Sequence, residues 1–223
     1  MKSLFPESII ERLYQCGVIA CMTIDNPNSA VKTARALIAG GIDAIELTLR
    51  TREAMESLRR IVNEVPEMLT GVGTILTEDQ VREVGKIGVA FGVSPGLSEK
   101  IVKAAQDVGL PFAPGVITPS EMEQAMDWGC REMKLFPAEP IGGIPYMRSI
   151  AIPYANVGIR FLPLGGLNLR IMGDYLRESC VLAVGGSWIV TPELLHTENW
   201  SAITFAAKNA SNVVAEVRRR KRL

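Results

Sequence analysis

Short apolar runs rich in β-branched residues alternate with helical patterns along the whole chain. Eight of these runs have the length and composition of buried strands: Val18–Met22, Ala44–Leu49, Leu69–Val72, Val89–Val93, Pro111–Ala113, Glu132–Phe136, Ile159–Leu164 and Val181–Val184. Their first residues lie 20 to 27 positions apart, which is the length of one strand–helix unit. The pattern predicts eight such units in a single domain that spans residues 1–223.

The expected helix boundaries agree with this spacing. Thr77–Gln80 and Thr118–Glu121 are capping boxes, in which a threonine is followed three positions later by glutamine or glutamate. The helical pattern Ala30–Ala39 ends at Gly40, and glycine is a common residue at the end of a helix. A further helix over about Pro6–Gln15 precedes the first strand.

These elements predict an α/β fold, a (β/α)8 or TIM barrel with an extra N-terminal helix. The alternative is an open, doubly wound sheet, whose Rossmann version carries a G-x-G-x-x-G motif after its first strand. Here the first strand continues as Cys21–Asp25, which contains no glycine. The barrel is therefore favoured, and its active site is expected at the C-terminal ends of the strands.

Composition narrows the possible functions. Lys+Arg and Asp+Glu both number 24, so no excess positive charge points to a nucleic-acid or membrane-surface partner. No apolar run approaches the ~18 residues needed to span a bilayer. The chain has one histidine and no CxxC pair, so we expect no metal site. Reduced thiols, and hence a cytoplasmic protein, are expected from the scattered cysteines at positions 16, 21, 130 and 180.

Side-chain alternation on two strands places charged groups inside the barrel. On the second strand, Glu46, Thr48 and Arg50 share the face opposite an apolar set. On the sixth, Lys134 and Phe136 share the inward face. Two interpretations of Glu46 and Lys134 are open: a buried structural ion pair, or the amine and acid/base of a Schiff-base enzyme.

A second pair of charges is expected lower in the same barrel. Glu132 precedes Lys134 by two positions on the inward face, and Arg160 points inward from the next strand. Because these positions lie away from the C-terminal ends of the strands, we interpret Glu132 and Arg160 as a structural pair.

Three strand ends are rich in glycine: Gly71–Thr74, Pro163–Gly166 and Gly185–Trp188. The last two follow the seventh and eighth strands, where barrels commonly bind phosphate with backbone N–H groups. Tight turns also use glycine, but two such turns on the two expected strands favour a phosphate site. Ser187 would add a hydroxyl donor there.

Six motifs in order along the chain resemble those of one enzyme family. They are Glu46–Thr51, Gly71–Thr74, Ser94–Gly96, Pro114–Gly115, Lys134–Glu139 and Gly185–Trp188. Over nearly its whole length, the chain resembles the 2-keto-3-deoxy-6-phosphogluconate (KDPG) and 4-hydroxy-2-oxoglutarate (KHG) aldolases. The E-x-T-x-R and K-x-F-P-A pieces are specific in combination.

The resemblance implies a class I aldolase that cleaves a 2-keto-4-hydroxy acid to pyruvate and an aldehyde, glyceraldehyde 3-phosphate. It implies a homotrimer with a phosphorylated keto acid as its small-molecule partner, and no cofactor beyond the lysine imine. Lys134 matches the Schiff-base lysine and Glu46 the general acid/base. The matching substrate-binding positions are Arg50 and Thr74 for the pyruvate carboxylate, Pro95 and Phe136 for the pocket walls, and Gly165, Gly166, Gly186 and Ser187 for the phosphate.

The chain departs from the family pattern at three places. Ala20-Cys21 stands where relatives more often have Pro-Val, and Leu135 replaces a frequent phenylalanine at an outward position. Leu164 stands where relatives usually have threonine, on the inward face near Lys134. Leu164 leaves open a catalytically silent sugar-phosphate-binding barrel. A second alternative is another phosphate-barrel enzyme such as an epimerase, although the chain lacks the paired acids or metal ligands typical of those enzymes.

Overall fold

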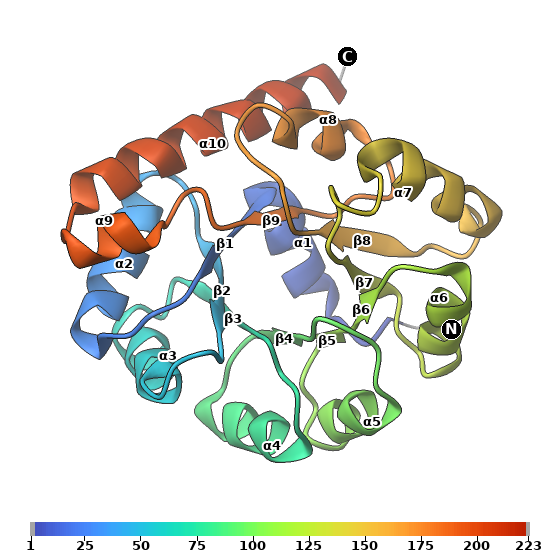
Figure 1. Cartoon of the computed structure of the whole chain (residues 1–223), viewed down its shortest axis with the longest axis horizontal. Helices are drawn as coiled ribbons and strands as arrows, with labels where there is room; N and C mark the ends of the chain where they lie inside the picture. Colours follow the sequence, from blue (N-terminus) through green and yellow to red (C-terminus); the bar gives the residue numbers. More distant parts are fainter. Residues whose placement is uncertain (1–2, 222–223) are drawn as a thin grey trace.

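The computed structural model describes residues 3–221, so both ends of the predicted domain, Met1-Lys2 and Arg222-Leu223, lie outside the described residues. The fold is α/β, with parallel strands curled around a common centre and helices on the outside (Figure 1). The strands are β1 (Val18–Met22), β2 (Ala44–Thr48), β3 (Leu69–Gly73), β4 (Phe91–Val93), β5 (Phe112–Ala113), β6 (Gly115–Val116), β7 (Glu132–Leu135), β8 (Arg160–Pro163) and β9 (Val184–Gly186).

The helices follow the strands in alternation and form the outer layer. They are α1 (Glu7–Cys16), α2 (Pro27–Ala39), α3 (Ala54–Glu64), α4 (Glu78–Ile87), α5 (Glu99–Asp107), α6 (Pro119–Asp127), α7 (Gly143–Ala151) with the 3-10 turn η1 (Ile152–Tyr154), α8 (Met172–Arg177), α9 (Pro192–His196) and α10 (Trp200–Lys221). Within residues 3–221, none of these helices is long and apolar enough to cross a membrane.

The strands form two parallel sheets, where the sequence pattern predicts one ring of eight strands. One sheet has the order β5-β4-β3-β2-β1-β9, and the other has the order β6-β7-β8. The predicted fifth strand, Pro111–Ala113, is present as β5, and an unpredicted strand, β6, follows it directly after Pro114, which has no N–H to donate to a sheet. The predicted eighth strand also differs: regular pairing begins only at Val184, while Val181 makes an isolated parallel bridge to Phe161.

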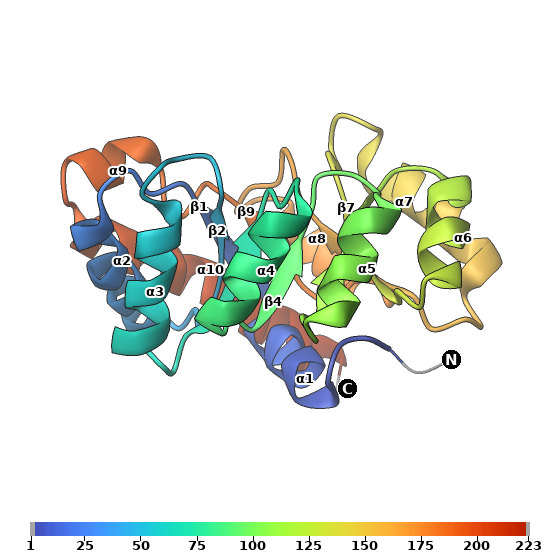
Figure 2. The same cartoon turned by 90° about the horizontal axis from the view of Figure 1, so that it is seen from below.

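Helix α1 confirms the extra N-terminal helix. It begins after Pro6 and ends where Gly17 adopts a left-handed conformation. The helix lies across the end of the strands opposite the loops that precede α3 and α9 (Figure 2), and its side chains Ile10 and Leu13 are buried. Phe5, just before α1, is also buried and lies with its ring centroid 6.3 Å from that of Phe91 on β4. The segment from Phe5 to Leu13 therefore adds buried apolar side chains to the core.

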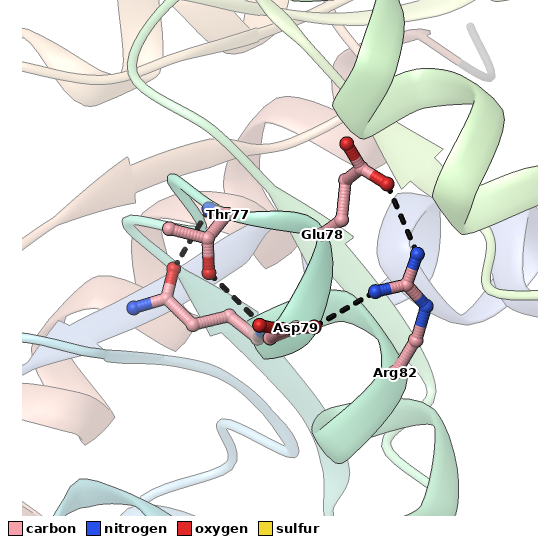
Figure 3. Close-up of polar contacts among 5 residues, drawn as sticks. Thr77, Glu78, Asp79 and Arg82 are labelled. Carbon is pink, nitrogen blue, oxygen red and sulfur yellow. Dashed lines mark hydrogen bonds and ion pairs between the residues drawn. The ribbon is translucent and has the colours of Figure 1, made fainter.

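Both predicted capping boxes are present. At the start of α4, the Thr77 hydroxyl accepts a hydrogen bond from the Gln80 N–H, and the Gln80 side chain accepts one from the Thr77 N–H (Figure 3). Arg82 adds ion pairs to Glu78 and Asp79, 3.0 and 2.8 Å away. The two hydrogen bonds of the capping box satisfy backbone N–H groups that have no partner within the helix.

The predicted structural pair of Glu132 and Arg160 is confirmed. The two residues are partners in the β7–β8 register, and Arg160 Nε lies 3.3 Å from Glu132 Oε1. The Ser3 hydroxyl donates a hydrogen bond to the other oxygen, which connects the N-terminal segment to β7. Burial raises the pKa of Glu132, although Ser3 and Arg160 oppose that shift.

Candidate active site

Strand β2 and the turn that follows it bring three polar side chains to one cavity. Glu46, Thr48 and Arg50 all line it, as the alternation along the strand predicts. Glu46 is 2% exposed. The neighbouring strand leaves room for its carboxylate because the nearest residue is Gly73, where an added Cβ would lie 1.9 Å from Glu46 Oε1. Glycine at this position is thus required by the close approach of the carboxylate.

Strand β7 brings Lys134 to the same place from the other sheet. Lys134 is paired in register with Gly115 on β6 and Leu162 on β8, and its side chain is buried. Its Nζ donates a hydrogen bond to Glu46 Oε1 at 2.8 Å and lies 5.2 Å from the centre of the Phe136 ring. An amine and a carboxylate from opposite sheets therefore meet in direct contact, away from bulk water.

Above this pair lies a cavity of about 360 Å³ at the C-terminal ends of the strands. Its volume suits a small organic substrate. Most of the residues predicted for the site line it, namely Glu46, Arg50, Lys134, Phe136, Gly165, Gly186 and Ser187.

Three of the predicted binding residues are not among the residues that line the cavity: Thr74, Pro95 and Gly166. Thr74 directly follows β3 with a φ of 61°, an uncommon conformation for threonine. The backbone of Pro95 packs on Gly115, where an added Cβ would lie 2.3 Å from the Pro95 carbonyl. Gly166 packs on the Glu139 side chain. The structure places these residues around the site, and their roles stay predictions.

The cavity also contains residues that the analysis of the sequence did not select. Cys21 and Thr23 reach it from the end of β1, and the alternation that placed Glu46 could have found both. The Thr23 hydroxyl lies 2.8 Å from that of Thr48. Val190 and Leu195 line the cavity from the segment after β9, which carries no local pattern to indicate this.

The thiol of Cys21 contacts the second oxygen of the buried carboxylate. Cys21 Sγ lies 3.6 Å from Glu46 Oε2, within range of a sulfur hydrogen bond. Burial and then the Glu46 carboxylate raise the pKa of Cys21 well above its usual value. The thiol is therefore protonated and is a donor toward Glu46.

The two glycine-rich turns predicted for phosphate border the cavity beside Ser187. Gly165 has a φ of 94°, a conformation that glycine alone adopts readily. Gly186 faces the Trp188 ring, and an added Cβ would lie 1.7 Å from it. Backbone conformation therefore explains the glycine at position 165, and close packing explains the one at position 186. Both positions also suit anion binding. No three His, Cys, Asp or Glu side chains within residues 3–221 are arranged to hold a metal ion.

The sequence of the chain also matches a known protein family. The family model described as KDPG and KHG aldolase matches residues 9–206. The chain belongs to the KDPG and KHG aldolase family. It is 43% identical over 201 residues to the 2-dehydro-3-deoxy-phosphogluconate aldolase of Dickeya dadantii, covering 90% of this chain and 93% of that one. It is 41% identical to the KHG/KDPG aldolase of Escherichia coli K12, covering 86% and 90% of the two chains.

Solved structures of the aldolase family have the same fold. The KDPG aldolase of Legionella pneumophila, with pyruvate captured at low pH as a covalent carbinolamine intermediate, superposes with a TM-score of 0.86 at 35% identity. That match covers 90% of this chain and 97% of the other. The Zymomonas mobilis ZM4 enzyme with 3-phosphoglycerate gives a TM-score of 0.85 at 34% identity, over 92% and 95% of the two chains.

Proposed function

We propose that this protein is a class I aldolase, a carbon–carbon lyase that forms a Schiff base with its substrate on Lys134. Its substrate is 2-keto-3-deoxy-6-phosphogluconate or a related 2-keto-4-hydroxy acid, and its products are pyruvate and an aldehyde. The observation that carries this proposal is the Lys134–Glu46 contact of 2.8 Å beneath a cavity of substrate size. The covalent pyruvate adduct of the Legionella relative supports the same chemistry.

The first step forms the imine. Lys134 attacks the C2 carbonyl of the keto acid as a neutral amine, so its ammonium first gives up a proton, which Glu46 is placed to accept. A carbon–nitrogen bond forms to give a carbinolamine, and loss of water then gives the iminium. Glu46 supplies a proton to the departing hydroxyl in this step.

The second step breaks the C3–C4 bond. The Glu46 carboxylate, directly or through a water, takes the proton of the C4 hydroxyl, and the electrons of the C3–C4 bond move into the iminium. The aldehyde is released and an enamine remains on Lys134. Protonation of the enamine carbon and hydrolysis of the imine then release pyruvate and restore the free lysine.

Binding groups lie at both ends of the cavity. Arg50 offers a planar guanidinium that can hold the pyruvyl carboxylate with two hydrogen bonds, and we propose that Thr74 assists it from the end of β3. Phe136 lines the cavity, and we propose that it forms a wall of the substrate site together with Pro95, which packs behind the lining on Gly115. At the opposite side, we propose that the aldehyde phosphate binds the turns that contain Gly165, Gly166, Gly186 and Ser187.

We further infer that the two sheets are parts of one closed (β/α)8 barrel in a single domain, residues 1–223. The direct succession of β5 and β6 and the Phe161–Val181 bridge support closure on both sides. We also propose a cytoplasmic homotrimer that uses no cofactor. Light scattering should then give about three times the chain mass of 24.3 kDa, whereas the mass of a single chain would reject the trimer.

Trapping with pyruvate and borohydride tests the proposed function. Reduction of the imine should add one pyruvyl group to the protein, and peptide mass spectrometry should place it on Lys134. Lys134→Ala should fold and remain unlabelled. Labelling that persists in this variant would falsify the lysine assignment.

Turnover of 2-keto-3-deoxy-6-phosphogluconate and its unphosphorylated analogue then separates the remaining possibilities. A trapped adduct with aldehyde release supports the aldolase. An intact fold that neither traps pyruvate nor cleaves a keto acid would indicate a silent binding barrel or an epimerase instead. Faster turnover of the phosphorylated acid would support phosphate binding by the two glycine-rich turns.

A further inference from the structure

The Glu46 carboxylate is held from both sides by side chains of two other strands, Cys21 on the neighbouring β1 and Lys134 on β7 of the other sheet. Lys134 Nζ donates to Oε1 at 2.8 Å, and Cys21 Sγ donates to Oε2 at 3.6 Å. Cys21 and Glu46 are register partners in the β1–β2 pair, so the backbone fixes their separation. Within the described part of the chain, the other titratable side chain lining this cavity is Arg50.

We propose that Cys21 is a positioning residue for Glu46, whose thiol keeps the carboxylate aimed at the substrate once Lys134 has become covalently bound. This inference rests on the proposed aldolase function. In the free protein, the ammonium of Lys134 carries three N–H donors. In the iminium, its nitrogen carries a single N–H, so the lysine holds Glu46 less firmly at the stage when Glu46 moves protons. The contact with Cys21 is unaffected by imine formation.

The Cys21 thiol is protonated, which suits a hydrogen-bond donor and does not suit a nucleophile. Burial and the nearby carboxylate keep Cys21 protonated, since its pKa is raised well above the usual value. A thiol reacts with electrophiles as the thiolate, so this cysteine is unreactive at neutral pH. Its proton has a second acceptor within reach, the Ile19 carbonyl at 3.7 Å. The charged carboxylate is the stronger acceptor of the two.

Three substitutions at one position separate donation from packing. Cys21→Ser keeps a donor, Cys21→Ala removes the donor and part of the volume, and Cys21→Val fills the volume without a donor. The matched control is Cys180→Ala, because Cys180 precedes β9 and does not line the cavity. Each variant is assayed for kcat and KM with 2-keto-3-deoxy-6-phosphogluconate across pH, and for pyruvate trapping by borohydride.

We expect Cys21→Ala and Cys21→Val to lower kcat by about three- to tenfold, the net worth of one hydrogen bond, with KM and trapping near the parent's. Fewer donors then stabilise the charged carboxylate, so the acidic limb of the kcat profile should move to higher pH. Cys21→Ser should keep a profile close to the parent's, and Cys180→Ala should match the parent.

Several results would overturn the proposal. A parental pH profile and kcat in Cys21→Val would show that Cys21 only fills space, and the same result in Cys21→Ala would show that the contact is inert. If Cys21→Ala fails to fold, the comparison of serine with valine still decides. A parent protein that traps no pyruvate would defeat the proposed function itself, whereas an active parent with unchanged variants would defeat only the role of Cys21.

Discussion

The contact between Lys134 and Glu46 is a poor source of stability. Both side chains are at most 6% exposed, so each loses most of its hydration, and a buried pair of this kind adds little over apolar residues of similar size. Its position at the floor of the cavity agrees with the proposed reaction, in which the amine and the acid/base must be adjacent. The arrangement is therefore better explained by catalysis than by folding.

Glu46→Gln tests this explanation. The amide keeps the shape of the side chain but cannot carry the transferred protons, so we expect the pyruvate adduct still to form, although more slowly, while turnover falls by roughly 10²–10⁴. The measurements are borohydride trapping and steady-state kinetics on the same preparation. Turnover within a few-fold of the parent's would make Glu46 a structural partner only.

Leu164 gives a second prediction at the scale of a single residue. It lines the cavity, is 4% exposed and packs against Gly185. Leu164→Thr would place a hydroxyl near the iminium, and we expect kcat/KM for the phosphorylated substrate to rise by ~0.5–1.5 kcal/mol of transition-state stabilisation. Leu164→Val is the matched control, because it has the shape of threonine without the hydroxyl. An equal change in both variants would make the effect one of volume.

At the scale of the elements, the sequence predicts strands and helices best where local side chains determine their boundaries. The capping boxes at Thr77 and Thr118 and the alternation on β2 correctly locate two helix starts and three cavity residues. The break between β5 and β6 could also have been read from Pro114, which removes one ladder hydrogen bond. The late start of β9 could not, because its pairing depends on β1, more than 160 positions earlier in the chain.

Thr77→Ala should weaken helix α4 without affecting the chemistry. Loss of the hydroxyl removes the acceptor for the Gln80 N–H, and we expect the free energy of unfolding to fall by ~0.5–2 kcal/mol. Urea denaturation measures this change, and kcat should stay at the parental value. Thr77→Ser keeps the oxygen and should be close to the parent. If both variants lose the same stability, the hydrogen bond is not the cause.

At the scale of the whole molecule, a few polar contacts join the N-terminal segment and the two sheets. Lys134 and Glu46 connect the two sheets, and Glu132 connects Ser3 to β7 and β8. Such connections cannot be read from local sequence, because they join residues 88 and 129 positions apart. Alternation predicts which side chains point inward, and only the folded arrangement determines which of them meet.

Glu132 should make global stability depend on pH. Its pKa is raised in the folded state, so folding favours its protonated form. Below the ordinary carboxyl range the group is protonated in both states and has no effect. As the pH rises through the raised folded pKa, its contribution becomes fully destabilising. Glu132→Gln should remove this dependence, so its free energy of unfolding relative to the parent's should increase with pH.

Urea denaturation from about pH 4 to pH 8 measures that difference. Glu67→Gln is the matched control because Glu67 is exposed, and its difference from the parent should not change with pH in the same way. A difference for Glu132→Gln that is constant or falls with pH would mean that the contacts to Ser3 and Arg160 outweigh burial.

The position of Lys134 at the floor of the cavity agrees with the order in which the proposed reaction releases its products. Helix α1 covers the end of the strands opposite this cavity (Figure 2), and Phe5, Ile10 and Leu13 in or just before it are buried, so within residues 3–221 the route to Lys134 runs through the cavity. In the proposed reaction, the pyruvyl half is fixed at the bottom of this passage and the aldehyde half stands between it and solvent. The aldehyde therefore leaves first and pyruvate last. In the direction of synthesis the sequence reverses, and pyruvate is the first to enter.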